Sequence, residues 1–331
     1  MEAVENSIKN IIIKNQIVVA LLLVVLGWFI IQIKEILILF FISYILMAAL
    51  KPYVSYLTKF KIPRTVAIAL LYVLTLGVVV LLIVPIIPFF SSQISSLIVS
   101  FPKYLDDILH ALRINIQASQ MQEFLTSQFD TITSNAFAVT GAILGSIFSL
   151  FLVFVVSFYL MQDENRVKKE LMLFFPKKDK EKAMSTMAMI EEKLGAWFRG
   201  QLVLCFTIGL LTWIALTVIS FPFALPLALL AGLLEIVPTI GPILSAVPAV
   251  IVALSISPGL AFTIIIIYIV IQMIENNVLV PKVMQKAVGL NPIVIILAIT
   301  IGAKLLGLMG ALLCIPFISM IIIIIKNMRK E

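Results

Sequence analysis

A glutamate lies deep in an apolar tract, and two prolines and a glycine follow it closely. Glu235 is the only charged residue between positions 199 and 275, and Pro238, Gly241 and Pro242 come within the next seven residues. A carboxylate at bilayer depth costs about 2.5–3.5 kcal/mol, and a proline inside a helix costs about 3 kcal/mol. Irregular backbone survives at that depth only where it is buried in protein or lines a wet cavity. The stretch predicts either a kink whose glutamate binds a neighbouring helix or a hairpin tip lining a solute or ion path; the predicted path residues are Glu235, Pro238, Thr239, Gly241 and Pro242.

A second polar group closes the apolar helix that follows. Gln272 and Glu275 are three residues apart and therefore share one helix face. Asn276 and Asn277 come next, and amides together with a carboxylate can coordinate a hydrated cation or a polyhydroxylated solute. The alternative for the asparagines is a helix cap at the membrane interface. All four are predicted path residues.

The third candidate group interrupts the last apolar stretch, 292–325. Lys304 is its only basic residue, and Gly307 and Gly310 follow. The three residues predict the tip of a second broken segment. Lys304 either pairs with Glu235 across two meeting tips or ends a re-entrant helix, and both readings stay open.

The amino-acid composition indicates that membrane-spanning segments hold these three groups of residues in place. Of 331 residues, 62% are hydrophobic and only 12% are charged, whereas a soluble domain has about 25% charged residues. The apolar runs lack alternation, so the predicted fold class is an all-α polytopic membrane protein, not a barrel. The net charge of +7 lies in short loops beside spans, which indicates membrane topology and no nucleic-acid partner.

The chain divides by composition into regions of different character. Residues 91–135 carry apolar positions at helical spacing and an excess of acids, which predicts external amphipathic helices. The charge run at 162–199 is most simply a solvated cytoplasmic face. A single helix over 223–256 would be about 50 Å long, well beyond a hydrocarbon core of about 30 Å, which favours a hairpin. The predicted regions are an N-terminal three-span region at 1–90, external amphipathic helices at 91–135, a fourth span at 136–161, charged cytoplasmic helices at 162–199, and a C-terminal transport region at 200–331 with re-entrant hairpins near 223–256 and 292–325; about eight membrane segments result.

Signatures of other function classes are missing from the sequence. It has no GxxxxGK[ST] loop for ATP, no GxSxG or HExxH motif, and no cysteine–histidine cluster for zinc. The one histidine, His110, lies in the amphipathic stretch, and Cys205 and Cys314 both lie in apolar segments. We therefore expect no enzyme activity, no catalytic residues, no metal and no cofactor apart from Na⁺ or H⁺ coupling.

Four motifs carry a resemblance to a known family. EIVPTIGP at 235–242, QMIENNVLVPKVM at 272–284, VGLNP at 288–292 and GLMGALLCIP at 307–316 resemble the AI-2E family of bacterial transporters. The resemblance implies an external insertion between the third and fourth spans, a homo-oligomer (a pentamer), and a hairpin-containing transport unit with elevator-type movement. It also implies export of autoinducer-2 for some members and Na⁺(Li⁺)/H⁺ antiport for others.

Three functional hypotheses follow. The first is a secondary transporter that exports a small hydrophilic solute, with autoinducer-2 as one candidate. The second is a cation/proton antiporter, and the third is a non-transporting membrane scaffold that organises partners. In each, the expected partners are membrane lipid and other copies of the chain, with a small polar solute or cation for the first two. The expected location is the bacterial cytoplasmic (inner) membrane, with both termini cytoplasmic.

Overall fold

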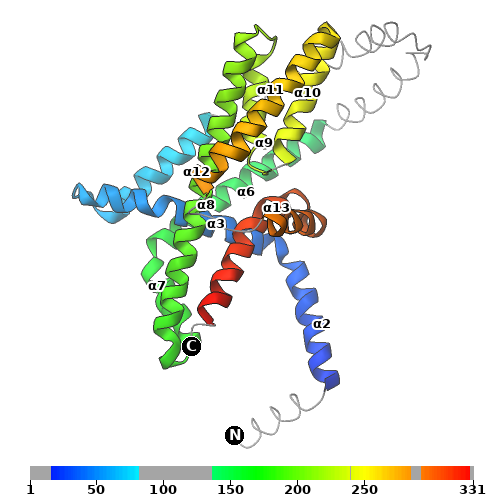
Figure 1. The fold of residues 1–331 in the computed structure, drawn as a ribbon. Helices are drawn as coiled ribbons and strands as arrows, with labels where there is room; N and C mark the ends of the chain where they lie inside the picture. The colour runs from blue at the N-terminus through cyan, green and yellow to red at the C-terminus, as the bar shows by residue number, and fades with distance from the viewer. Residues whose placement is uncertain (1–15, 82–135, 239, 285–291, 329–331) are drawn as a thin grey trace, which may run out of the picture.

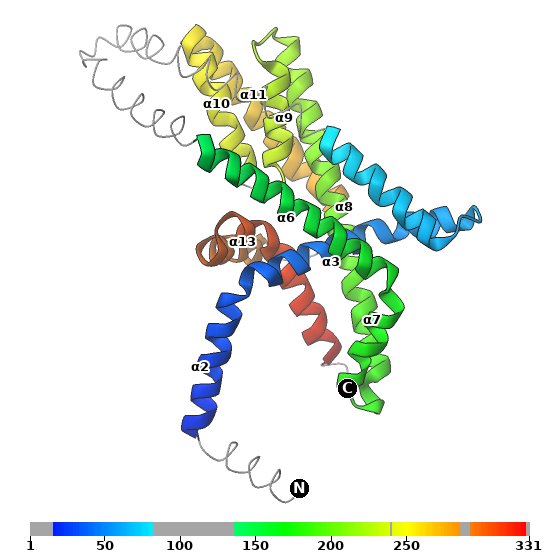
Figure 2. The same cartoon turned by 180° about the vertical axis from the view of Figure 1, so that it is seen from behind.

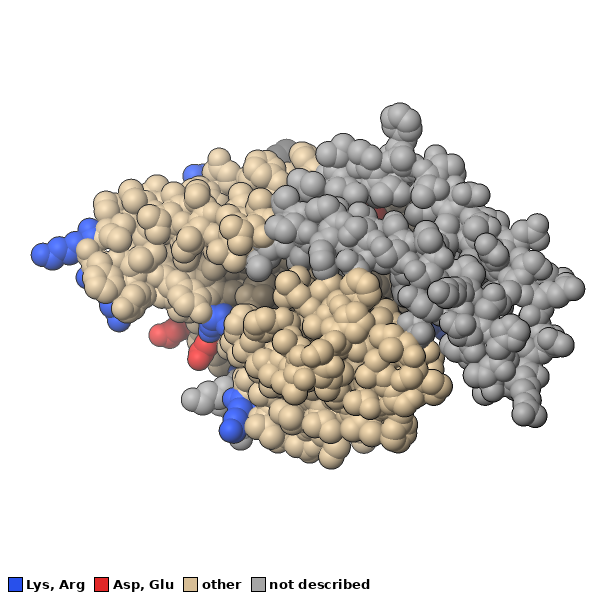
Figure 3. Space-filling model, turned by 90° about the horizontal axis from the view of Figure 1, so that it is seen from above, with Lys and Arg blue, Asp and Glu red and all other residues tan. Residues whose placement is uncertain are grey.

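The computed structural model describes residues 16–81, 136–238, 240–284 and 292–328, and this part of the chain is helical without strands. Five of its helices are long and apolar enough to cross a membrane. Seen from above, the described surface is almost entirely free of charge, and Lys, Arg, Asp and Glu appear only towards one side (Figure 3). The protein is therefore an all-α, multi-pass membrane protein.

Three of the first four described helices pack around one core. Helix α2 (Gln16–Gln32) leads into α3 (Lys34–Lys59), followed by the helix Arg64–Leu81, and α6 (Ala136–Gln162) lies against α3, whereas α2 points away from this group (Figure 2). The buried faces of α3, Arg64–Leu81 and α6 share a core that includes Met47, Ile68 and Phe154. Within it, the Tyr72 hydroxyl hydrogen-bonds the Ser157 hydroxyl at 2.6 Å.

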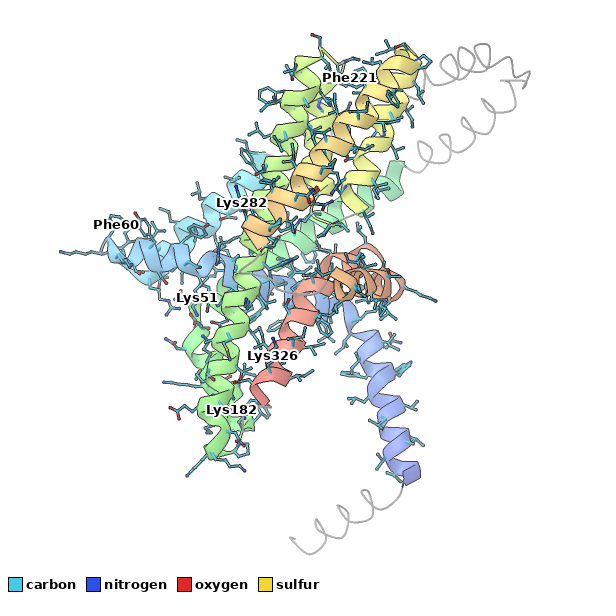
Figure 4. All side chains as sticks on the ribbon, viewed as in Figure 1. Lys51, Phe60, Lys182, Phe221, Lys282 and Lys326 are labelled. Atoms are coloured by element: carbon cyan, nitrogen blue, oxygen red, sulfur yellow. The ribbon has the colours of Figure 1, made fainter. Side chains whose placement is uncertain are left out.

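A long helix connects the charged region to the membrane region. After α7 (Glu164–Leu171) and two short 3₁₀ turns, Met172–Phe174 and Lys177–Asp179, helix α8 runs unbroken from Lys180 to Val218. Its 39 residues extend about 58 Å, and α7 lies beside its first part (Figure 1). Figure 4 labels Lys182 near its start and Phe221 just beyond its end. The region boundary expected at 199/200 therefore falls inside one continuous helix.

The expected first broken segment is a pair of helices. Helix α9 (Ala224–Leu234) and α10 (Ile240–Ile256) pack against each other, and 235–239 separates them. Helix α11 (Pro258–Ile274) follows, packed on α10; the Ser257 side chain caps it by accepting from the Leu260 N–H at 3.1 Å. Whether the α9–α10 pair enters and leaves one membrane face stays a prediction.

The C-terminal helices contain the second broken segment. Helix α11 continues through a π-helical turn (Glu275–Leu279) into α12 (Val280–Met284), and α13 spans Pro292–Met328. Gly307 interrupts α13 with φ 61° and ψ −143°, a conformation that favours glycine. A Cβ on Gly302 would overlap the Gly310 carbonyl, although eight helical residues span about 12 Å. The chain therefore turns back on itself at Gly307, at the position predicted for the second tip. Re-entry into the membrane stays a prediction.

Candidate functional site

Glu235 sits where α9 ends, and its carboxylate is sealed from the surface. The Glu235 N–H still bonds the Ala231 carbonyl at 3.0 Å, and the residue is only 1% exposed. Neither carboxylate oxygen has a hydrogen-bond donor among the described residues. A buried acceptor without a donor costs about 1–3 kcal/mol, and more when charged.

The prolines and the glycine explain why the chain leaves the helix here. Pro238 and Pro242 supply no N–H, so the backbone is held by short turn bonds, from Ile240 N–H to the Pro238 carbonyl and from Gly241 N–H to the Val237 carbonyl. A Cβ on Gly241 would overlap the Leu234 carbonyl. Only glycine therefore lets α10 begin so close to the end of α9.

Glu275 is the second buried carboxylate of the site. It is 3% exposed and begins the π-helical turn, and the Gln272 amide donates to its carboxylate at 3.1 Å. The shared face predicted for Gln272 and Glu275 is present. π-Helical turns occur frequently at functional sites because they displace side chains from regular helical positions.

The two carboxyl groups lie within hydrogen-bonding reach of each other. Two ionised carboxylates only accept hydrogen bonds, so they repel at this distance. Neither Glu235 nor Glu275 forms an ion pair with a Lys or Arg side chain of the described residues. The arrangement suits a shared proton or a bound cation between the two groups.

Gln201 is a member of this site that sequence reasoning missed. It lies on α8, is 2% exposed, and its amide donates to the Glu235 backbone carbonyl at 2.6 Å. Close backbone packing brings α8 to α9, since a Cβ on Gly232 would lie 2.8 Å from the Cys205 carbonyl oxygen. A polar residue directly after Gly200 at the start of an apolar helix was the available signal.

Other predicted path residues lie apart from this pair. Asn276 and Asn277 are exposed, and Asn277 donates to the Met273 carbonyl at 2.8 Å. Lys304 is exposed and forms no ion pair with Glu235. Pro238 and Pro242 are half-buried, Gly241 and Gly310 are buried, Gly307 is exposed, and Thr239 lies outside the described residues.

The crossing of α3 and α8 fixes the position of the part of α8 that carries Gln201. Pro52 inside α3 has no N–H, which leaves the Ala48 carbonyl without its helical donor. The Arg199 guanidinium donates to the Ala48 and Ala49 carbonyls at 3.4 and 3.2 Å. A Cβ on Gly195 would overlap the Ala48 carbonyl, so the two helices cross in direct backbone contact.

A cluster of ion pairs stabilises the same crossing on the side of the charged arm, which consists of α7 and the first part of α8. We call Lys51, Arg64, Lys168, Glu164 and Glu191 the junction cluster. Lys51 contacts both carboxylates at 2.6 Å, Lys168 contacts them at 2.7 and 2.9 Å, and Arg64 contacts Glu164 at 2.9 Å. The label in Figure 4 places Lys51 beside α8. Both glutamates are buried, so the interpretation of 162–199 as a purely solvated face does not hold for them.

The junction cluster also lowers the pKa of one of its own carboxyl groups, that of Glu164. Burial by itself raises the pKa of the Glu164 carboxyl, but hydrogen bonds from Lys168 and Lys51 and the charges of both lysines outweigh it. The result is a pKa of about 2, so Glu164 is ionised at any physiological pH. Glu164 is thus a permanent negative charge at the centre of the cluster.

Within the described residues, no three His, Cys, Asp or Glu side chains come together to hold a metal ion. The side chains that the structure brings together at the site carry carboxyl, amide and thiol groups.

Comparison with known proteins agrees with this architecture. The profile of the family described as AI-2E family transporter matches residues 17–330. The putative transport proteins YueF and YrrI of Bacillus subtilis (strain 168) are 27% and 28% identical, covering 85% and 88% of this chain and 80% and 86% of theirs. The AI-2 transport protein TqsA of Escherichia coli (strain K12) is 23% identical over 85% of this chain and 83% of its own.

Proposed function

The chain belongs to the AI-2E family of transporters, and from that premise we propose that it is a secondary transporter exporting a small hydrophilic solute. Autoinducer-2 is a candidate cargo because a relative is named as an AI-2 transport protein. The observation that carries the proposal is the buried Glu235–Glu275 pair, held at breaks in two apolar segments. Polar groups at such breaks are the usual binding elements of secondary transporters.

An elevator-like alternating-access movement is the proposed mechanism. Support comes from the two interrupted segments, the α9–α10 pair and α13 with its turn at Gly307. Paired interrupted segments in one half of a chain are typical of transport units that carry the binding site. The α3–α8 crossing would then belong to the part that stays rigid, because the Arg199 hydrogen bonds and the ion pairs of the junction cluster hold its helices together.

Counterflow of candidate solutes in proteoliposomes tests the proposal. The test variant is Glu235→Gln with Glu275→Gln, and the matched control is Glu170→Gln, an exposed glutamate of α7. Hydrogen bonds to a charged group contribute about 1.5–3 kcal/mol, so we expect a roughly 10- to 100-fold loss of counterflow in the double variant and none in the control. Unchanged counterflow in the double variant would remove the site from the mechanism.

The carboxyl pair also favours a second candidate function, Na⁺(Li⁺)/H⁺ antiport. Two adjacent carboxyl groups that cannot both ionise cheaply alternate naturally between holding a proton and holding a cation. Vesicles with an internal pH dye distinguish the two functions. Antiport predicts a dye response when Na⁺ or Li⁺ is added outside, in either orientation of the gradient. No response in either direction would count against antiport.

Placement and assembly belong to the same proposal. The junction cluster and the charged α7–α8 arm would lie on the cytoplasmic side of the inner membrane, as the positive-inside rule requires, together with both termini. Several copies, a pentamer in the proposed form, would assemble through apolar faces. Protease access to the α7–α8 arm in inside-out vesicles, compared with whole cells, tests the orientation, and native mass spectrometry tests the assembly.

A further inference from the structure

Several deeply buried polar side chains have no hydrogen-bond partner among the described residues. They are the Trp197 indole N–H, the amide oxygens of Gln162 and Gln201, the Glu235 carboxylate oxygens, and the Thr212 and Tyr268 hydroxyls. Gln162 stands at the end of α6, where its amide nitrogen donates to the Thr65 hydroxyl, and it is not part of the face described next. Trp197, Gln201 and Thr212 are 3%, 2% and 1% exposed. Native interiors rarely leave such groups unpaired, because each costs about 1–3 kcal/mol. Their number and position therefore need an explanation.

The α8 members of this set share one face of the helix. Trp197, Gln201 and Thr212, with Cys205 between them, fall within about 80° of one another at about 100° per residue. They extend about 22 Å along the helix axis. The Cys205 thiol lies near both Glu235 and Glu275, which connects this face to the carboxyl pair. We call this face the α8 polar track.

Helix α11 supplies a matching face. Tyr268 and Glu275 are seven residues apart, which places them within about 20° of each other around α11. Tyr268 packs against the core that contains Leu216, one turn beyond Thr212. Helices α8 and α11 contact each other and run in opposite directions (Figure 1). Gln201 therefore lies near the Glu275 end of α11, and Thr212 lies towards the Tyr268 end.

We propose that the path of the transported solute continues from the carboxyl pair along the α8 polar track towards Thr212 and Tyr268. This inference rests on the proposed transport function and specifies its route. Water or cargo on the path satisfies the unpaired groups, which apolar neighbours cannot do. The path crosses the core beside Ile208 and Ala231, in a part of the molecule that composition alone marks as uniformly apolar.

The chemistry of the track also limits the cargo. Of its six unpaired atoms, the Gln201 oxygen and the two Glu235 oxygens only accept hydrogen bonds, the two hydroxyls both donate and accept, and one is an indole N–H. None of the residues that line the proposed path, on the α8 polar track or at Tyr268, Glu235 and Glu275, carries a positive charge. A cargo that donates hydrogen bonds, either uncharged and hydroxylated or cationic, matches this lining, and an anion does not.

Cysteine accessibility in the membrane tests the route. In a background with Cys205→Ser and Cys314→Ser, we compare Thr212→Cys with Ile68→Cys, an equally buried apolar position in the core of the N-terminal helices. The probes are a positively and a negatively charged methanethiosulfonate of similar size, and intact-mass spectrometry measures the modified fraction over time. A residue on a wet path needs no local opening, so we expect Thr212→Cys to react at least about tenfold faster than Ile68→Cys, and faster with the cationic probe.

The unsubstituted protein provides a second measurement that cannot fail through misfolding. Cys205 lies on the track and is half-buried, whereas Cys314 lies on α13, is 8% exposed and donates to the Ala311 carbonyl. We expect the cationic probe to modify Cys205 and to spare Cys314. Equal, slow reaction of Thr212→Cys and Ile68→Cys, with Cys205 as inert as Cys314, would overturn the route.

The two proposals fail in different ways. Reactive Thr212→Cys without counterflow of any solute or Na⁺-driven proton movement leaves the wet track standing and refutes transport. Measured flux with unreactive Thr212→Cys and Cys205 refutes the track and leaves transport standing.

Discussion

Replacing Glu164 by glutamine tests whether the junction cluster stabilises the protein. A carboxyl whose pKa falls from 4.5 to about 2 gains about 3 kcal/mol in its ionised form, at about 1.4 kcal/mol per pKa unit. Two of its partners, Lys51 and Arg64, are 33% and 43% exposed, and solvent screening reduces the gain. We therefore expect Glu164→Gln to lower the free energy of unfolding by about 2–3 kcal/mol.

The assay is thermal unfolding of the purified protein in detergent, with Glu170→Gln as the matched control. Glu170 pairs with Arg166 at 3.0 Å, but both side chains are more than half exposed, so that pair contributes at most about 0.5 kcal/mol. At about 2 °C per kcal/mol or more for a chain of this size, Glu164→Gln should lower the Tm by roughly 4–6 °C and the control by about 1 °C. Equal Tm values for the two variants would refute the reasoning.

The pH dependence of the same pair of proteins checks the sign. Glu164 has a depressed pKa, so its stabilisation is fully present above pH 4.5 and disappears as the pH falls towards about 2. The Tm difference between the wild-type protein and Glu164→Gln should be constant from pH 6 to 8. It should shrink steadily below about pH 4.5, and a difference that grows on acidification would contradict the assigned pKa.

Three further substitutions test contacts that hold the fold together. In Gly241→Ala the new Cβ overlaps the Leu234 carbonyl, so the α9–α10 pair should not close and folded protein should not accumulate, as measured by fluorescence size-exclusion chromatography. Gly259→Ala, which has open space around the new Cβ, should be harmless in the same assay. Gly307→Ala should lower the free energy of unfolding by about 1–3 kcal/mol in thermal unfolding, since φ 61° with ψ −143° is a conformation nearly restricted to glycine. Tyr72→Phe should cost about 1–2 kcal/mol by leaving the Ser157 hydroxyl unpaired, and an unchanged Tm would show that water replaces the phenol.

The sequence predicts the carboxylates of the site because each violates the composition around it. Glu235 and Glu275 interrupt apolar runs, and their cost in hydrocarbon is so large that burial in a polar site follows from the residue type. The breaks at Gly241 and Gly307 are predictable for a similar reason, since proline and glycine act locally. All four positions have the predicted place in the chain's helix pattern.

The residues that sequence reasoning missed depend on contacts between distant segments. Gln201 looks like an interface residue at the start of a span until α9 brings the Glu235 carbonyl to its amide. Glu164 and Glu191 are 27 positions apart, and only the fold of α7 onto α8 gives them common lysine partners. A charge run that faces solvent and one that buries two of its glutamates have the same composition, so periodicity cannot separate them.

Continuity of α8 limits which parts of the protein can move relative to one another. A helix without a break transmits tilt and translation along its whole length, so the charged arm, the α3–α8 crossing and the α8 polar track form one mechanical unit. Any sliding surface must therefore lie between α8 and its neighbours, not within α8. An antibody fragment or a cross-link that holds the α7–α8 arm in place, far from the carboxyl pair, would also hold the α8 side of the proposed path in place. Transport turnover would then stall, although the helices on the opposite side of the path could still move.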